Sequence, residues 1–472
     1  MITGKKIIFF ELNEVPFRIL DHFSKVMPES NLARLRKACR AYETVAEDSG
    51  HLSPWITWPT LHRGVTNDIH EITDLGVDLT RVDKELPPVW KILAESGVNV
   101  GMFGSLHSHP LPEDLSNYSF YVPDTFAAGP ECFPKRYEAF QDFNLKMAGM
   151  NGRSVSKKIA FKEAARFLLA APELGLRGNT ALSLVKQLTS ERIAKQRTVR
   201  RRTSQVQIAF DFFIKALSSD RPEITFFFTN HVASSMHRYW PAIFPDDYQS
   251  LLYDQEWIAK WKEEIPFTMR VADQQLGALM AFVDNNHDYS LIIATSMGQA
   301  AVEGRMKIKK TIIVKSLNRL MEAIGMSPTE WERRPAMVPQ YNVAISDSAR
   351  AKFLTSINLL RVNGKNFKVT DTGDNVFSLS LFLPNKNEIE AVLGNMTISA
   401  DTAGLKNVDL LDAAGSNAYH IPEGMLMVYD PRSHKPSKKQ ERPRISTLDI
   451  APALLGNFGI PLPEYMNSVR GL

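Results

Sequence analysis

Residues 6–12 read K-I-I-F-F-E-L, an apolar run broken only by Glu11 and followed by Asn13 and Glu14. A strand with one face in water alternates apolar and polar residues, whereas this run is nearly continuous, as is typical of a strand buried on both faces. Such strands occur in parallel sheets whose two faces are covered by helices. The run therefore predicts the first strand of an α/β protein.

More runs of the same kind follow along the chain, at Val98–Gly104, Glu223–Thr229, Tyr289–Thr295 and Gly424–Tyr429. Helical patterns lie between them, for example Pro88–Ser96, Thr203–Leu217 and Phe267–Asp284. Strands that alternate with helices predict a doubly wound, mostly parallel sheet. Ligands of such sheets bind outside the carboxyl ends of the strands, so the residues that follow each run are the first candidates for a site.

Two stretches interrupt this rhythm. Residues 131–204 are basic and helix-forming without a strand candidate, and they predict a helical insertion. Residues 307–407 combine a helical pattern at Ile312–Ile324 with alternating pieces such as Val376–Phe382, and they predict a small α+β cap. We expect a core made of residues 1–130, 205–306 and 408–472, with insertions at 131–204 and 307–407.

The stretch Ser53–Gly64, S-P-W-I-T-W-P-T-L-H-R-G, places one threonine, Thr57, between two tryptophans and two prolines. Proline fixes φ and lacks an N–H group, which predicts a stiff turn rather than a helix interior or a central strand. Such a turn can hold the Thr57 hydroxyl in one direction, and a metal or a base would make that hydroxyl nucleophilic. A turn threonine that bonds its own backbone is the alternative interpretation.

Composition sets broad limits. The chain has 472 residues, of which 44% are hydrophobic, and a formal net charge of +4, which does not favour a nucleic-acid partner. The two cysteines, Cys39 and Cys132, have no metal-ligand spacing and suit a reducing compartment. We recognise no signal peptide and no uninterrupted apolar stretch of about 18 residues that would predict a membrane span. We therefore expect a cytoplasmic protein.

Five segments occur in a particular order: the first run with its acid, P-W-I-T-W-P (54–59), S-S-M-H-R-Y-W-P (234–241), I-I-A-T-S-M-G-Q (292–299) and Y-H-I-P-E-G-M-L-M-V-Y-D-P (419–431). With the tail I-S-T-L-D-I-A-P-A-L-L-G-N-F-G-I-P (445–461), this order resembles the alkaline phosphatase superfamily, and within it the type I phosphodiesterase/nucleotide pyrophosphatase branch. The resemblance implies that superfamily's fold. It also implies Thr57 as nucleophile and His237 and His420 as metal ligands.

The resemblance breaks at several metal ligands. The first acid is Glu11 where the family has an aspartate, and Ala233 occupies the place of an acid four residues before His237. The Asp-His pair of the family is replaced by Ser296 and Met297, and a thioether is a poor ligand for hard or borderline divalent ions. A two-metal clamp is therefore not expected. The ligands that keep their family places are Glu11, His237 and His420.

Two imidazoles and one further ligand can hold a single zinc ion with an open coordination position. The third ligand would be Glu11 or His231, which we expect on the same loop as His237. An ion bound by Glu11 and Asn13 with Thr57 is the alternative, and so is a site without any metal. Each histidine has a second interpretation as a core or loop side chain that bonds a backbone carbonyl.

Glu11 at the end of a buried strand needs a cation, a set of donors or a raised pKa, because an unpaired buried carboxylate costs several kcal/mol. Arg63, Arg238 and Asn13 are candidates for binding the substrate, since the arginines would stabilise charge on nonbridging oxygens.

The leading hypothesis is a phosphodiesterase- or phosphatase-like hydrolase, or a transferase, that acts on a phosphate or sulfate ester through Thr57 with a reduced metal site. One alternative is a non-hydrolytic member that binds a sugar phosphate or nucleotide sugar. Another is a metal-free transferase in surface-polysaccharide assembly with Glu11 or a histidine as general base. One fold hosts many chemistries, so the fold alone does not choose between them. The expected partner is a small phosphate ester or nucleotide sugar.

Overall fold

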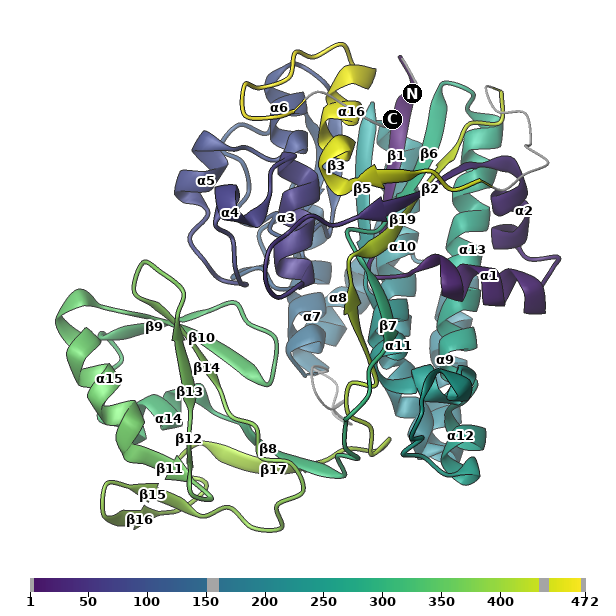
Figure 1. Cartoon of the computed structure of the whole chain (residues 1–472). Coiled ribbons are helices and arrows are strands. Elements are labelled where there is room, and N and C mark those ends of the chain that lie inside the picture. The colour runs from purple at the N-terminus through teal and green to yellow at the C-terminus, as the bar shows by residue number, and fades with distance from the viewer. Residues whose placement is uncertain (1–3, 151–160, 433–440, 468–472) are drawn as a thin grey trace.

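The computed structural model describes residues 4–150, 161–432 and 441–467 of the chain. Its largest element is an eight-stranded sheet with the strand order β20-β2-β19-β6-β1-β5-β3-β4 (Figure 1). The strands are β1 (Lys6–Leu12), β2 (Arg40–Val45), β3 (Val100–Phe103), β4 (Tyr118–Val122), β5 (Ile224–Thr229), β6 (Tyr289–Ala294), β19 (Glu423–Tyr429) and β20 (Arg444–Ser446). All five apolar runs of the sequence are strands of this sheet.

The sheet is mixed. β1 pairs in parallel with β5 and β6, so that Phe9 lies opposite Phe226 on one side and Ile292 on the other. β3 is parallel to β4 and β5, and β2 is parallel to β20. β19 runs antiparallel to both of its neighbours, β2 and β6. The fold is therefore a mixed α/β architecture whose central strands are parallel.

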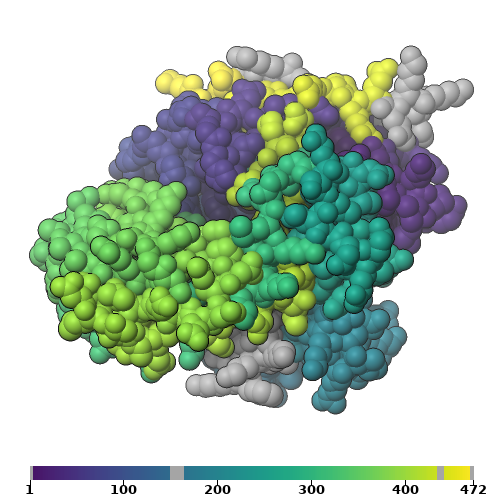
Figure 2. Space-filling model, turned by 60° about the horizontal axis from the view of Figure 1, so that its bottom comes forward, coloured from purple at the N-terminus to yellow at the C-terminus, as the bar shows by residue number. Residues whose placement is uncertain are grey.

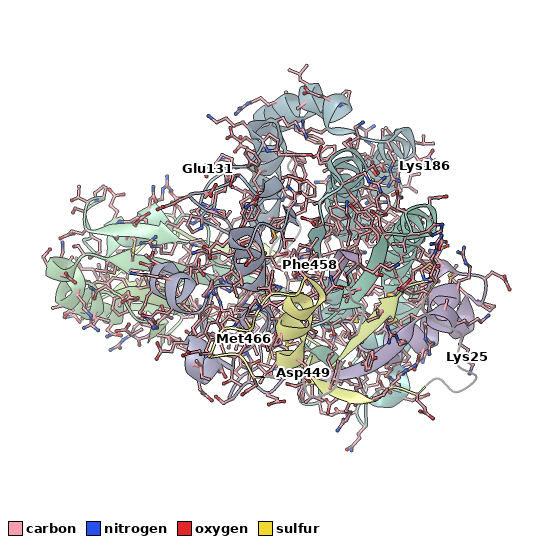
Figure 3. The ribbon with its side chains drawn as sticks, turned by 90° about the horizontal axis from the view of Figure 1, so that it is seen from above. Lys25, Glu131, Lys186, Asp449, Phe458 and Met466 are labelled. Atoms are coloured by element: carbon pink, nitrogen blue, oxygen red, sulfur yellow. The ribbon has the colours of Figure 1, made fainter. Side chains whose placement is uncertain are left out.

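Helices pack against both faces of the sheet. Successive side chains of β1 point to opposite faces, so neighbouring residues of β1 belong to different hydrophobic cores. Phe10 belongs to a core shared with α1 (Phe17–Val26), α2 (Asn31–Ala38), α10 (Arg201–Asp220), α11 (His231–Ile243) and α13 (Glu264–Asn285). Phe9 belongs to a second core, shared with α3 (Pro54–Arg63), α6 (Val89–Glu95) and α16 (Ile450–Asn457). Figure 3 looks down onto α16, between the labelled Asp449 and Phe458.

A group of helices follows β4. It comprises α7 (Glu138–Met150), α8 (Phe161–Leu174) and α9 (Gly178–Ile193), which lead into α10. Phe167, Ala171 and Leu174 on α8 pack into the main core. Figure 2 shows this part of the chain as a blue lobe at the lower right. Shorter helices elsewhere are α4 (Asn67–His70), α5 (Thr80–Glu85) and α12 (Gln255–Trp261).

The green lobe of Figures 1 and 2 has a hydrophobic core of its own, centred on side chains such as Leu320, Val343 and Phe353. Its helices are α14 (Leu317–Ala323) and α15 (Arg350–Leu359). Its strands are β8 (Lys310–Val314), β9 (Trp331–Arg334), β10 (Gln340–Ile345), β11 (Leu360–Val362), β12 (Lys365–Asn366), β13 (Lys368–Asp371), β14 (Val376–Ser380), β15 (Ala391–Leu393), β16 (Met396–Ile398) and β17 (Leu405–Asp409). The strands β7 (Gly298–Ala301) and β18 (Ala418–Ile421) form a two-stranded antiparallel sheet where the chain leaves and re-enters the main body.

The expected helix over residues 312–324 is wrong in its first half. Residues 310–314 form β8, which pairs antiparallel with β17, and only the second half is helical. The β-branched run Thr311–Val314 suits a strand. Ser316 then begins the helix, because its hydroxyl accepts a hydrogen bond from the Arg319 N–H.

The expected turn at residues 53–64 is also wrong, because Pro54–Arg63 forms helix α3. Ser53 is the N-cap and Pro54 occupies the first turn, where a missing N–H costs nothing. Pro59 lies inside the helix and leaves the carbonyl of Trp55 without its helical donor. The Nε2 of His107 contacts that carbonyl oxygen at 3.0 Å, so a tertiary hydrogen bond replaces the lost one.

Candidate metal centre

Glu14 lies just beyond the carboxyl end of β1 and is 2% exposed. Its φ of 60° is left-handed, a conformation that non-glycine residues seldom adopt and that often marks a functional turn. The turn directs the Glu14 carboxylate across the end of the sheet, where it meets two imidazoles from distant parts of the chain.

His237 comes from α11, and its Nε2 lies 3.0 Å from Glu14 Oε2. Its Nδ1 contacts the carbonyl oxygen of Ala418 at 2.7 Å. Pro241, four residues later in the helix, has no N–H for the His237 carbonyl, which instead accepts a hydrogen bond from the Asn417 N–H at 2.6 Å. A proline inside α11 thus fastens the helix to the segment that carries the second histidine.

His420 comes from β18, which pairs with β7 so that His420 lies opposite Gln299. Its Nε2 is 3.4 Å from Glu14 Oε2, and its Nδ1 contacts the Leu52 carbonyl oxygen at 2.7 Å. Leu52 directly precedes the N-cap of α3. The start of α3 therefore lies beside the cluster.

Amide side chains hold the carboxylate. Asn13 Nδ2 donates to Glu14 Oε1 at 2.8 Å and to Asn230 Oδ1 at 2.8 Å, while its own Oδ1 accepts from the Trp58 indole at 2.8 Å. Gln299 Nε2 donates to Glu14 Oε2. Asn13 therefore holds the Glu14 carboxylate, and its predicted contact with a substrate stays a prediction.

The electrostatics of Glu14 and His420 are coupled. Burial alone would raise the pKa of Glu14, but the imidazoles of His420 and His237 lower that pKa well below its ordinary value. Burial alone would lower the pKa of His420, but the Glu14 carboxylate raises it above its ordinary value. Glu14 is therefore a carboxylate, and positive charge is favoured between it and the histidines.

The donor set fits a divalent cation. Glu14, His237 and His420 each offer one ligand atom, and these atoms lie within 4.8 Å of one another, the only such group of three histidine, cysteine or acidic residues in the described parts of the chain. Both nitrogens of each imidazole lie near oxygens, the Nδ1 atoms near backbone carbonyls and the Nε2 atoms near Glu14, where a cation could be bound. The carbonyls on the Nδ1 side are the outer-shell acceptors that orient metal-binding histidines.

Glu11 is not part of this cluster, contrary to expectation. Its Oε1 lies 2.6 Å from His62 Nε2, and its Oε2 accepts a hydrogen bond from the Ser105 hydroxyl at 2.6 Å. The side chain is fully buried on the α3 side of the sheet. The buried Glu11 carboxylate has the partners that its burial was predicted to need, and these are the His62 imidazole and the Ser105 hydroxyl.

Thr57 is fully buried in α3. Its hydroxyl donates to the Ser53 carbonyl at 3.2 Å and lies 2.8 Å from the Ser296 hydroxyl, which then acts as the donor. Ser296 and Met297 follow β6 and are fully buried as well. Ser296 thus contacts the candidate nucleophile from the position where the resemblance implies an aspartate.

His231 does not join the cluster either. It begins α11, so the expected loop is a helix, and its Nε2 contacts the Thr268 carbonyl at 3.2 Å. Burial lowers the pKa of His231 to about 4, which keeps the imidazole neutral. His231 also lines the pocket described below.

Neither predicted arginine faces the cluster's carboxylate. Arg63 is 1% exposed, and its guanidinium binds Asp83 at 2.6 Å and the Leu86 carbonyl. Arg238 follows His237 in α11 and donates to Asp412. Both guanidinium groups make ion pairs that join elements of the fold, and the Arg238–Asp412 pair is buried.

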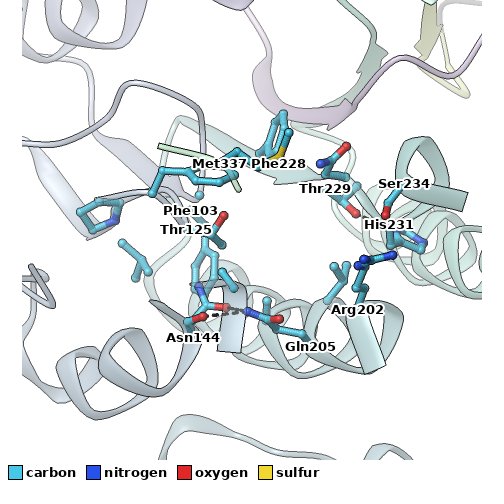
Figure 4. A pocket seen from close by; sticks show the side chains of 18 residues that line it. Phe103, Thr125, Asn144, Arg202, Gln205, Phe228, Thr229, His231, Ser234 and Met337 are labelled. Carbon is cyan, nitrogen blue, oxygen red and sulfur yellow. Dashed lines mark hydrogen bonds between the residues drawn. The ribbon is translucent and has the colours of Figure 1, made fainter. Parts of the chain in front are cut away.

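A pocket of about 180 Å³ lies beside the cluster, at the carboxyl ends of β3, β4 and β5 (Figure 4). Its walls are largely apolar and include Phe103, Phe228 and Met337, the last from the green lobe. Asn230 lines the pocket and also bonds Asn13, while Ser234 lines it one helical turn before His237. Asn230 and Ser234 therefore connect the pocket lining to the residues around the cluster.

No protein family model matches the chain, and no curated protein matches it by sequence. Solved structures similar to it include murine ectonucleotide pyrophosphatase/phosphodiesterase 5, with a TM-score of 0.41, 10% identity and coverage of 98% of both chains. An inactive variant of that protein in complex with AMP gives a TM-score of 0.40 at 10% identity, covering 98% of this chain and 97% of the other. The human protein gives 0.41 at 11% identity, covering 98% and 97%. At these values the likeness says nothing of which residues act, or on what.

Sequence reasoning noted Glu14 after the first strand but chose Glu11, because the resemblance places an acid within the strand end. It did not select Gln299 or Asn230. The left-handed turn that aims Glu14 has no signature in the sequence, since glycine and asparagine are the usual residues there. Among helices of the described residues, none is both long and apolar enough to span a bilayer.

Proposed function

We propose that the chain is a metal-dependent phosphoric ester hydrolase or phosphotransferase with a reduced, single-ion site. Glu14, His237 and His420 are the ligands in this proposal, and zinc is the expected ion. The observation that carries it is the convergence of one oxygen of the buried Glu14 carboxylate and the Nε2 atoms of two half-buried histidines. Phosphate ester chemistry is supported by the ordered motifs that contain both histidines.

Two imidazoles, one carboxylate and an open position are a common arrangement of catalytic zinc. When bound, the ion would polarise a phosphoryl oxygen and lower the pKa of a coordinated water to about 7. The chain's own residues supply the geometry. Asn13 and Gln299 fix the carboxylate, and the Leu52 and Ala418 carbonyls fix the imidazole rings.

Thr57 is the candidate nucleophile in this proposal. Its hydroxyl bonds the Ser53 carbonyl, so a rotation about χ1 is needed before the oxygen can reach a substrate. If Thr57 is the nucleophile, Thr57→Ala loses turnover but keeps the ion. If a coordinated water attacks, Thr57→Ala keeps both, and equal diester turnover in the variant and the wild type removes Thr57 from the mechanism.

The decisive experiment is a titration with Zn²⁺ and Co²⁺, in which Co²⁺ absorbance reports the ligand geometry. We expect one ion per chain in the wild type and loss of tight binding in Glu14→Gln and His420→Gln. Gln299→Ala, which removes only a support of the carboxylate, should weaken affinity about 10- to 100-fold. Because protons compete for the Nε2 atoms, affinity should rise with pH through the raised pKa of His420.

His231→Gln is the control, since it changes a buried histidine that lies outside the cluster. It should bind the ion like the wild type and turn over bis(p-nitrophenyl) phosphate at the same rate. Equal ion affinity in Glu14→Gln and the wild type would refute the assigned site. Turnover that survives both chelation and Glu14→Gln would refute the proposed chemistry.

A second candidate is a binding protein without hydrolysis, which takes a sugar phosphate or nucleotide sugar. The buried Thr57–Ser296 contact favours it, because the hydroxyls bond each other where the resemblance implies a metal ligand. This function predicts a thermal shift with nucleotide sugars and no turnover. A metal-free transferase predicts turnover that chelators leave unchanged.

A further inference from the structure

Helix α9 exposes apolar side chains on its outer face and buries the polar side chains of Gln187 and Glu191 on its inner face. Leu182, Val185 and Leu188 follow one another at a spacing of three residues, so they share one face, and they are 52%, 57% and 44% exposed. Ile193 at the end of the helix is 88% exposed. A helix on the surface of a globular protein normally turns such residues toward the core.

The inner face of α9 combines Leu184, which packs against the main core, with buried polar side chains. Gln187 and Glu191 are buried, and Gln187 Nε2 donates to Glu191 Oε1 at 2.8 Å and to the Arg197 carbonyl at 2.7 Å. Glu191 also accepts hydrogen bonds from the Arg201 guanidinium, at 2.7 Å from its Nη2. These polar contacts hold α9 against α10. The face with Leu182, Val185 and Leu188 therefore points outward.

Cations surround this face. Lys186, Arg192, Lys195 and Arg197 are exposed on α9 and the turn after it. Among the described side chains of α8, α9 and that turn, the exposed acid is Glu173. Figure 3 places Lys186 toward the outer edge of the molecule, away from the sheet.

Helix α8 adds a second apolar stripe. Leu168 and Leu169 are 61% and 85% exposed, while Phe167 and Ala171 on its other face pack into the core. The exposed leucines therefore belong to a helix whose other face is packed against the core.

We propose that α9, with its flanking cations, docks on the surface of a lipid bilayer that contains anionic lipids. An amphipathic helix with basic residues beside an apolar face lies in the interface plane with that face among the acyl chains. Basic side chains at the headgroups add attraction to anionic lipid. Pairing two copies through this face in a two-fold contact would bring the same cations together, which disfavours a second copy as the occupant.

The test is flotation with vesicles of phosphatidylcholine alone or with phosphatidylglycerol. Wild type should float with the phosphatidylglycerol vesicles, and less at high salt, because salt screens the headgroup attraction. Leu182→Ser/Leu188→Ser and Lys186→Gln/Arg192→Gln should each lower the bound fraction at least about tenfold. The matched control is Leu359→Ser/Met396→Ser, which removes equally exposed apolar residues from the green lobe and should bind like the wild type.

A probe at the face gives an independent readout. A bimane label at Val185→Cys should shift to the blue on vesicle binding, and the two native cysteines are both buried. No flotation of wild type, or equal flotation of the leucine double variant and wild type, would overturn the proposal. A dimer in sedimentation velocity that the leucine double variant abolishes would overturn it too, because a second copy would then cover the face.

Discussion

At the scale of single residues, the histidines of this chain differ in their electrostatic environment. His237 and His420 face the Glu14 carboxylate, which raises the pKa of His420 above its ordinary value against the effect of burial. His70 and His107 are buried without such a partner, and burial lowers the pKa of each to about 3.

Histidines that are buried in the neutral form predict how stability depends on pH, and His231 is another of them. In the folded state the pKa of His231 is about 4, against about 6.5 when unfolded, so unfolding takes up a proton between those values. The free energy of unfolding should therefore fall as the pH drops below about 6.5, with a slope near 1.4 kcal/mol per pH unit for each such histidine. Urea unfolding of wild type between pH 7 and 4.5 measures this.

In His231→Gln the slope should be smaller by about the contribution of one histidine. Asp124 acts in the opposite sense, because burial raises its pKa to about 6, but it is present in both proteins and cancels in the difference. Identical slopes in the two proteins would mean that His231 is protonated in the folded state.

At the scale of elements, prolines inside α3 and α11 build tertiary contacts. Each proline lacks the N–H that would bond the carbonyl four residues before it, and that carbonyl bonds another segment instead. In α3 the Trp55 carbonyl contacts His107, and in α11 the His237 carbonyl accepts from the Asn417 N–H. These contacts draw separate segments together around the start of α3 and the metal cluster.

The α3 contact predicts a coupling between Pro59 and His107. In the wild type, His107→Asn removes the donor of the Trp55 carbonyl and should destabilise the protein by about 1–3 kcal/mol. In the Pro59→Ala background the new N–H can bond that carbonyl, so the same change should cost about 1–2 kcal/mol less. Urea unfolding of the four proteins gives the coupling energy, and additive effects would show that the two residues act independently.

At the scale of the whole molecule, the cluster of Glu14, His237 and His420 depends on segments that are far apart in sequence but meet at one rim of the sheet. Glu14 follows β1, His237 lies on α11 after β5, and His420 lies on β18, which pairs with β7 between the main body and the green lobe. That lobe packs around a separate hydrophobic core. We propose that residues 307–407 are a folding unit inserted into the core and that residues 131–204 are a second insertion.

Excising the green lobe tests this proposal. Lys310 and Asp409 lie opposite each other in the β8–β17 pair, so a short turn can replace residues 311–408. The shortened chain should unfold cooperatively and keep an ion affinity within about threefold of the full chain, because domains with their own cores fold independently. Loss of cooperative unfolding would show that the lobe is part of the main folding unit.

Apolar patterning predicted the main strands because burial on both faces leaves a continuous run that local sequence displays. It failed at Pro54–Arg63 and at His231–Ile243, where tertiary hydrogen bonds compensate prolines that local rules treat as helix breakers. The resemblance implied Glu11 as a metal ligand, but the partners of Glu11 in this structure are His62 and Ser105, which lie far away along the chain.

The amino-acid sequence by itself determined the α/β class, the core strands and the two histidines that meet at the candidate centre, because apolar periodicity and motif order are local properties. Only the tertiary structure decided which acid joins those histidines. Glu11 and Glu14 are three residues apart, but one points into the α3 side of the sheet and the other turns across its rim. That choice depends on a left-handed turn and on amide donors from distant segments, which exist only once the chain has folded.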